Sequence, residues 1–234
     1  MKLRAIVFFG VLFLAAQANA QEKPVLKNLK EKASYSIGLN LGRSLGSDLK
    51  KQLVDIDPNL LVKGIQDALS GATPLLSNEE IQETMVVLQK EMAEKQKQRG
   101  EAFLSENKKK EGVKTLASGL QYKVIKAGTG KKPKINDTVT VNYRGTLIDG
   151  TEFDSSFRRG QPATFLVSGV IPGWTEALPL MGEGAKWQLF VPSNLAYGER
   201  GAGGVIGPNT TLIFEIELIS VQENKQEKKE ENKK

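Results

Sequence analysis

The residues that could do chemistry in this chain form a narrow set, because the 234-residue sequence contains no histidine and no cysteine. Their absence excludes Ser-His and Cys-His nucleophiles and the usual zinc sites. The acidic residues show no D-x-D-x-D-G calcium spacing, so neither a metal site nor a cofactor is predicted. What stands out is VNYRGTLIDGTEFDSS, residues 141–156, which places Tyr143, Phe153 and Asp154 on two strands joined by a tight turn.

A wider set of side chains occurs where strands and loops in the second half of the chain are expected to converge. It comprises Tyr143, Phe153, Asp154, Phe165, Val170, Ile171, Trp174, Tyr197, Val205, Ile206 and Phe214. Any one of Phe165, Val205 or Phe214, taken alone, is most simply a core residue. The residue types therefore leave two interpretations open, a hydrophobic core or a functional site.

The first twenty residues differ from the rest of the chain. Lys2 and Arg4 precede an apolar run from Ala5 to Ala16 and a small-residue site at 18–20, which is the order of a secretory signal peptide. The run is shorter than the roughly 20 apolar residues of a membrane-spanning helix, and no later stretch approaches that length. We therefore expect a signal peptide at 1–20, no spanning segment, and export to the periplasm, with surface association or secretion as alternatives.

The charge balance argues against a nucleic-acid partner. Without Lys2 and Arg4, 31 basic and 27 acidic residues remain, and the formal net charge falls from +6 to +4. Lys and Glu are interspersed as on solvated helix faces. Basic residues are not interleaved with aromatic ones, as they are on nucleic-acid-binding surfaces.

The next region reads as helical, with a first domain over 21–76. Its first helix carries an apolar residue at every fourth position, and glycine follows three of them at 38, 42 and 46. Glycine inside a helix costs up to about 1 kcal/mol relative to alanine, so we expect close approach of another helix to compensate. Because two short helices and half of a long one bury too little surface for a robust monomer, this domain is expected to form a homodimer.

The later helices have clear ends. Asp57 is a predicted N-cap, with Pro58 at the first helical position and Gly71 just past the last apolar residue. Ser77 and Glu80 form a predicted capping box that opens a long connecting helix over 77–112. The stretch AEKQKQRGEA, 93–102, is polar on nearly every side and contains a weak point at Gly100, so it is expected to bridge domains rather than pack within one.

After Gly112 the apolar period changes to two. The alternating residues are Val139, Val141 and Tyr143, then Trp187, Leu189 and Val191, then Leu212, Phe214, Ile216 and Leu218. This predicts an α+β chain whose second domain, 113–221, is a mostly antiparallel sheet. The mixed-charge segment 222–234 has nothing to bury and is expected to be a disordered tail.

Several strings in the second domain resemble the FK506-binding-protein (FKBP) family of peptidyl-prolyl cis-trans isomerases. Besides residues 141–156 they are VIPGW (170–174), LPLMGEGAKW (178–187) and VPSNLAYGERGAGGVIGPNTTLIFEIELISV (191–221). YSIGLNLGRSLG (35–46) and FLSENKKKEGVKTLASGLQYKV (103–124) resemble the macrophage infectivity potentiator subfamily and its periplasmic relatives. That resemblance implies a helical dimerisation domain, a long connecting helix, and an antiparallel sheet wrapped around a short helix, which Pro179 should shorten or kink.

The resemblance also implies a site. Trp174 would form the floor under a substrate proline, and the walls would be Tyr143, Phe165, Val170, Ile171 and Phe214. Tyr197 and the backbone N–H of Ile171 would hold substrate carbonyls, and Arg159 would steady Asp154 and Tyr143. Phe153, Val205 and Ile206 complete the set. The role of Asp154 is left open: it is either structural or electrostatic, acting on the twisting amide.

The activity that the resemblance implies is isomerisation of X-Pro bonds in unfolded or partly folded exported proteins, with chaperone activity beside it. Rotation about an amide makes and breaks no bond, so the absence of histidine fits this activity. Macrolides of the FK506 and rapamycin type are candidate inhibitors, although Ala163 and Ala202 replace residues that are larger in many members. The alternative is a non-catalytic holdase chaperone in which the sheet domain only grips its clients.

Overall fold

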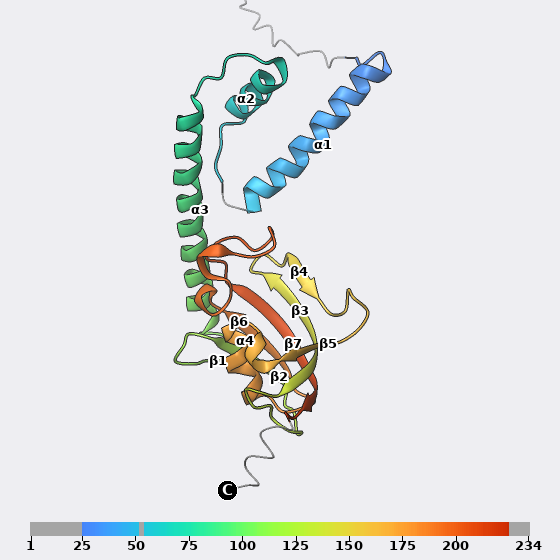
Figure 1. Ribbon diagram of the computed structural model, residues 1–234, viewed down its shortest axis with the longest axis vertical. Coiled ribbons are helices and arrows are strands. Elements are labelled where there is room, and N and C mark those ends of the chain that lie inside the picture. Colours follow the sequence, from blue (N-terminus) through green and yellow to red (C-terminus); the bar gives the residue numbers. More distant parts are fainter. Residues whose placement is uncertain (1–24, 52–53, 225–234) are drawn as a thin grey trace, which may run out of the picture. The chain divides into compact units, whose positions relative to one another are not determined.

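A computed structural model describes residues 25–51 and 54–224 of the chain (Figure 1). The helices that come first are α1 (Leu29–Lys51), α2 (Pro58–Ser70) and α3 (Asn78–Asn107), and an antiparallel sheet follows. This order confirms the predicted α+β fold class. The expected signal peptide, 1–20, lies outside the described residues.

The first helix, α1, exposes its apolar stripe. Ile37 is 68% exposed and Leu41 is 53% exposed. A Cβ at Gly38, Gly42 or Gly46 would meet no other atom within 4 Å among the described residues. The helix partner expected for these glycines, and the homodimer expected to supply it, therefore stay predictions.

The caps predicted for α2 and α3 are confirmed. The Asp57 side chain accepts hydrogen bonds from the backbone of Asn59 and Leu60, Pro58 opens α2, and Gly71 ends it in the left-handed conformation. Ser77 and Glu80 exchange the reciprocal hydrogen bonds of a capping box at the start of α3. These local signals fix where the helices begin because they satisfy backbone N–H groups that have no partner inside the helix.

The polar stretch 93–102 of α3 was expected to bridge domains without packing within one. That expectation is wrong, because the stretch packs against the sheet domain. Asn209 donates a side-chain hydrogen bond to the Ala93 carbonyl, and Gln96 donates one to the Thr210 hydroxyl. Gly100 is buried, and a Cβ there would collide with Thr211 Oγ1. The predicted weak point is therefore a close-packing point, and α3 runs through it without a break.

The last turns of α3 are also anchored to the sheet domain. Phe103 packs near Phe190, with ring centroids 6.0 Å apart. Asn107 Nδ2 donates to Gln121 Oε1 at 3.0 Å, and Gln121 Nε2 donates to the Leu104 carbonyl at 2.8 Å. The helix ends at Asn107 rather than near Glu111, and this buried amide network marks its end.

The sheet contains seven strands, all paired antiparallel, in the order β1-β2-β6-β7-β3-β4, with β5 also paired to β3. The strands are β1 (Val113–Thr115), β2 (Gln121–Lys126), β3 (Thr138–Leu147), β4 (Glu152–Ser155), β5 (Ala163–Leu166), β6 (Lys186–Val191) and β7 (Leu212–Gln222). The central strand β3 pairs with β7 on one side and with β4 and β5 on the other. It therefore reaches every strand that carries the candidate site residues of the sheet.

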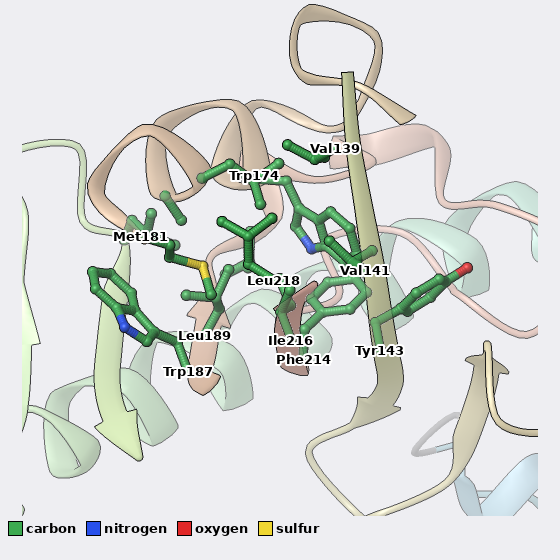
Figure 2. Close-up of a cluster of buried hydrophobic side chains, with 14 of the residues drawn as sticks. Val139, Val141, Tyr143, Trp174, Met181, Trp187, Leu189, Phe214, Ile216 and Leu218 are labelled. Carbon is green, nitrogen blue, oxygen red and sulfur yellow. The ribbon is translucent and has the colours of Figure 1, made fainter. Parts of the chain in front are cut away.

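The predicted period of two is confirmed along β3, β6 and β7. All ten alternating residues are buried, and many of them appear in the cluster of Figure 2. Phe190 is the exception, because it points to the opposite side of β6 and yet is buried as well. Phe103 of α3 covers that side, which explains why both faces of β6 are apolar there.

A short helix packs against the sheet. It is α4 (Pro172–Ala177), and it is followed by a single 3₁₀ turn, η2 (Leu178–Leu180), that contains Pro179. Trp174, Ala177 and Leu178 are buried in the same core as the strands. Pro179 thus shortens the helix as expected, since proline cannot donate the backbone bond that a continuing helix requires.

The sheet domain continues slightly beyond its expected end at 221. β7 extends to Gln222, which pairs with Thr138, and the backbone N–H of Asn224 donates to Asp137 Oδ1 at 3.1 Å. The expected tail therefore begins later than 222, and its residues from 225 onward lie outside the described ones. None of the helices in the described part of the chain has the length and hydrophobicity that a bilayer span requires.

Candidate active site

An indole ring stands at the centre of the candidate site. Trp174 is 3% exposed, and three aromatic rings meet it nearly at right angles. The ring centroids of Tyr143 and Phe214 lie 5.2 Å away at 88° and 82°, and that of Phe165 lies 5.8 Å away at 89°. Edge-to-face contacts at such separations are favourable because the ring edge is positive and the face negative.

The VIPGW string explains how the indole reaches this position. Pro172 opens α4, and the Trp174 N–H donates to the Ile171 carbonyl at 2.9 Å. A Cβ at Gly173 would lie 2.6 Å from Val191 Cγ1, so glycine lets α4 press against β6. The helix therefore sits close enough to the sheet for Trp174 to enter the layer of strand side chains.

A polar group borders the ring cluster. The Tyr143 hydroxyl donates a hydrogen bond to Asp154 Oδ2, and Arg159 Nη1 donates to Asp154 Oδ1. Arg159 Nη2 also donates to the Tyr143 hydroxyl at 2.8 Å. Figure 2 shows Tyr143 at the edge of the cluster with its hydroxyl directed away from the core. One face of Tyr143 thus belongs to the apolar cluster, while its hydroxyl belongs to a charged group.

These contacts shift the ionisation of both partners. Burial raises the pKa of the Tyr143 hydroxyl above its ordinary value of 10.0, and the hydrogen bond to Asp154 raises it further. Burial alone would raise the pKa of Asp154. The hydrogen bonds from Tyr143 and Arg159, together with the Arg159 charge, outweigh burial and hold that pKa below its ordinary value of 3.8. At neutral pH the pair is therefore a protonated phenol and a carboxylate.

The FDSS string fixes the carboxylate in place. Asp154 Oδ1 accepts the Ser155 N–H at 2.8 Å. The Ser156 hydroxyl, fully buried, accepts the Tyr143 N–H at 2.9 Å, and the Ser156 N–H donates to the Tyr143 carbonyl at 2.9 Å. Ser156 therefore holds the chain after β4 against β3 at the residue that contacts Asp154.

Gly145 is a site residue that sequence reasoning missed. A Cβ there would lie 2.6 Å from Phe153 Cζ and 2.9 Å from Phe214 Cε1. The two phenylalanine rings meet over this glycine at 87°, with centroids 5.6 Å apart. The available signal was a glycine inside an otherwise regular strand, which often marks a close approach.

The remaining predicted residues divide into two groups. Val170 and Ile171 are half-buried and pack against the core cluster, and Ile206 belongs to that cluster. Tyr197 is 40% exposed and Val205 is 51% exposed, and neither belongs to the core cluster or packs against it within the described chain. The structure thus brings together by direct contacts Tyr143, Trp174, Phe165, Phe214, Phe153, Asp154 and Arg159. Tyr197 and Val205 lie outside the core cluster.

Two polar groups near the indole have no partner among the described residues. The backbone N–H of Ile171 donates no hydrogen bond there, although its carbonyl accepts from Trp174 and Thr175. The Trp174 indole Nε1 is buried and also lacks an acceptor. Because most buried donors in proteins are paired, unpaired donors beside an aromatic cluster are candidates for contact with a ligand.

Comparison with known proteins gives matches over both halves of the chain. Residues 129–219 match the family described as FKBP-type peptidyl-prolyl cis-trans isomerase. Residues 30–124 match the domain described as amino terminal to FKBP-type peptidyl-prolyl isomerase.

Individual relatives match over most of their length. The chain is 51% identical to the outer membrane protein MIP of Legionella longbeachae, over 95% of this chain and 98% of that protein. It is 46% identical to the peptidyl-prolyl cis-trans isomerase Mip of Coxiella burnetii, over 95% and 99%. The crystal structure of FkpA from Escherichia coli, 40% identical, covers 85% of this chain and 99% of its own, with a TM-score of 0.56.

Fold, ring cluster and sequence matches define the class of protein as a peptidyl-prolyl cis-trans isomerase. The chain belongs to the FKBP-type family of these enzymes. The resemblance seen in the sequence is thereby confirmed for both domains, including the relation to the Mip and FkpA proteins.

Proposed function

We propose that this isomerase turns X-Pro bonds of incompletely folded exported proteins, with the substrate proline seated on Trp174. The observation that carries the proposal is the set of rings from Tyr143, Phe165 and Phe214, all at right angles to one indole. Such a site offers apolar contact to a pyrrolidine ring. It offers no group for proton transfer, which this reaction does not require.

The physical basis is the electronic structure of the amide. The barrier of about 18–20 kcal/mol to rotation comes from C–N double-bond character, which disappears as the amide twists. The planar amide carries more charge separation than the twisted one, so an apolar environment stabilises it less well than water does. Each preference of about 1.4 kcal/mol for the twisted form over the planar form accelerates rotation tenfold.

Asp154 is proposed to act by charge and position rather than as a base. Its oxygens already accept from Tyr143, Arg159 and the Ser155 N–H, and its pKa is lowered. A carboxylate so occupied is a poor proton acceptor at neutral pH. It orients the Tyr143 ring at the wall of the site and places a fixed negative charge at the border of the site.

Substrate carbonyls are proposed to bind two donors. The Ile171 N–H has no acceptor in the described chain, and the exposed Tyr197 is available to a bound peptide. Val170, Val205 and Ile206 would contact the residues beside the proline, and Phe153 would support Phe214. Binding by backbone carbonyls and one ring suits a client whose sequence varies around the proline.

The test is an isomerisation assay on short X-Pro peptides. Phe165→Ala removes one ring from Trp174 and should lower kcat/KM roughly two- to tenfold, because the indole loses an edge-to-face contact worth about 0.5–1.5 kcal/mol. Val124→Ala, an exposed residue of β2, is the matched control and should leave turnover unchanged. Equal turnover of wild type and Phe165→Ala would refute the site.

The enzyme is further proposed to be an exported homodimer, acting in the periplasm or at the cell surface. The exposed stripe and glycines of α1 support a second copy as the missing helix partner. Two linked sites raise the effective concentration of one flexible client at the second site.

A chaperone function is a second candidate, because large apolar side chains are exposed on α2 and α3. They include Leu60, Val62, Leu69, Met85, Val86 and Val87. If these surfaces hold clients, Asp154→Leu should still suppress aggregation of an unfolded protein while its peptide turnover falls. Leu69→Ser with Met85→Ser should show the reverse pattern.

Macrolide inhibition is proposed for the same ring cluster. Ala163 of β5 packs against the core, and the backbone of Ala202 bridges to Ile206. Small side chains at these two positions remove contacts that a macrolide could make at the rim. Inhibition by FK506 or rapamycin, measured with the same peptides, tests whether the ring cluster alone suffices.

A further inference from the structure

The loop between Tyr197 and β7 packs against the polar stretch of α3, residues 93–102. The contacts join Ala93, Gln96 and Gly100 of the helix to Asn209, Thr210 and Thr211, which we call the helix–loop clasp. Thr210 and Thr211 are each 3% exposed and Gly100 is buried, while the two side-chain hydrogen bonds of the clasp are partly buried. The reaction chemistry described above uses none of these six residues.

Three separate contacts make the clasp. Asn209 Nδ2 donates to the Ala93 carbonyl at 3.3 Å, and Gln96 Nε2 donates to Thr210 Oγ1 at 3.3 Å. Thr211 lies directly against Gly100, with its Cβ 3.3 Å from the position that a Cβ of Gly100 would take. Each contact joins one turn of α3 to one of three consecutive residues before β7.

The loop itself is a closed unit. Ala202 and Ile206 exchange two backbone hydrogen bonds of 2.8 and 3.0 Å, and the Asn209 N–H donates to the Gly198 carbonyl at 2.8 Å. The Thr210 hydroxyl donates to the Gly207 carbonyl at 2.8 Å while it accepts from Gln96. Internal bonds therefore fix the shape of residues 198–210, and the clasp fixes how that shape is placed on α3.

This placement matters because the loop carries part of the proposed substrate contact surface. Val205 and Ile206 lie within it, and Tyr197 directly precedes it. We propose that Gln96, Gly100 and Asn209 are positioning residues of the isomerase, which set substrate affinity by holding the 198–210 loop in register with the ring cluster. The inference rests on the proposed function, since it assumes that this loop touches the substrate.

Asn209→Gly isolates one contact of the clasp. Asn209 has a φ of 54°, which glycine adopts without strain, so the substitution removes the side-chain donor and leaves the turn intact. KM for X-Pro peptides should rise roughly two- to tenfold, the value of one neutral hydrogen bond, with kcat within about twofold of wild type. The rise should be larger for a bulky apolar residue before proline than for alanine.

Gly100→Ala, alone and combined with Thr211→Ala, tests the close contact between Gly100 and Thr211. The added methyl group collides with Thr211 Oγ1, so KM should rise. Adding Thr211→Ala removes that oxygen and should return KM toward wild type. Glu101→Ala, on the exposed side of the same turn, is the control and should change nothing. Thermal unfolding of each variant shows whether KM follows the contact or merely follows stability.

Two further variants separate this inference from the proposed site. Val205→Ala and Tyr197→Phe should raise KM if the loop touches substrate. If they do, while Asn209→Gly and Gly100→Ala leave KM unchanged, the positioning role is refuted and the site stands. If all four leave KM unchanged, the loop makes no substrate contact, and both the loop assignment and the positioning role are refuted.

Discussion

Tyr143 of β3 and Asp154 of β4 are joined by a hydrogen bond between the phenol and Oδ2, diagonally across a strand pair in which Gly145 stands opposite Asp154. The pair connects the edge of an apolar ring cluster to a charged arginine. The ring and the hydroxyl of Tyr143 can therefore be tested separately.

Tyr143→Phe removes the hydroxyl and keeps the ring beside Trp174. Asp154 Oδ2 then loses its donor, and Arg159 Nη2 loses an acceptor. We expect kcat/KM for X-Pro peptides to fall roughly tenfold or more, since one charge-assisted hydrogen bond contributes about 1.5 kcal/mol or more. Tyr122→Phe, which keeps its stack on Trp187, is the control. Equal loss in both variants would contradict a specific role.

The lowered pKa of Asp154 predicts how stability depends on pH. A carboxyl whose pKa is lower in the folded than in the unfolded chain stabilises the fold above its unfolded value of about 3.8. That contribution is lost as the pH falls below about 4 and the folded carboxyl takes up a proton. Urea unfolding at pH 7 and pH 3 should therefore show a smaller difference in Asp154→Asn than in wild type.

The size of this pH effect should be modest. The Asp154 side chain is 37% exposed and its partner Arg159 is 43% exposed, so solvent screens their interaction. If Asp154→Asn and wild type lose the same stability on acidification, other carboxyl groups dominate the acid response. Glu152→Gln, two residues before Asp154 on the same strand and paired with Arg144, is the matched control.

The helix caps and the alternation of apolar residues in the strands could be predicted from the sequence, because short-range interactions determine them. The caps at Asp57 and Ser77 and the period of two in β3, β6 and β7 are visible in the sequence because they satisfy backbone groups or bury one face. The ring cluster was predicted as a site only from the family resemblance, since the residue types alone did not distinguish a hydrophobic core from a functional site. Trp174 is in fact both, a buried core residue and the centre of the candidate site.

The docking of the polar stretch 93–102 of α3 was missed for a physical reason. Its contacts use a glycine, a backbone carbonyl and one glutamine, at Gly100, Ala93 and Gln96. None of these adds hydrophobicity, so a reading based on apolar periodicity sees only a solvated helix. Gly145 was missed likewise, because its role is the space it leaves for Phe153 and Phe214.

Gly145→Ala should disturb both folding and catalysis. The new methyl group would press on Phe153 and Phe214, and overpacking a filled site costs about 1–3 kcal/mol. We expect a lower free energy of unfolding and lower kcat/KM, because Phe214 also contacts Trp174. Replacing Phe153 by Leu in the same chain should relieve the clash. Full activity of Gly145→Ala alone would show that the rings move without consequence.

Asn107→Ala tests whether the last turns of α3 belong to the isomerase fold. It leaves Gln121 Oε1 buried without its donor, a loss of about 1–3 kcal/mol in the free energy of unfolding. Turnover per folded molecule should stay unchanged, because the amide network does not touch the ring cluster. Ser105→Ala, exposed on the preceding turn, is the control, and equal stability of both variants would contradict the anchoring role.

The exposed stripe on α1 makes the dimer testable without touching the site. Ile37→Glu with Leu41→Glu places two charges on the surface proposed to meet the second copy, where unpaired burial of charge is strongly unfavourable. Sedimentation should show a dimer for wild type at micromolar concentration and a monomer for this variant, whereas Lys32→Glu, which changes charge beside the stripe, should remain dimeric.

Turnover of short peptides per chain should not change, because the ring cluster lies within residues 143–214. Refolding of a long proline-limited client should slow, since the second site no longer acts on the same chain. A wild-type monomer under these conditions would refute the dimer, and would leave the glycines of α1 in need of another partner.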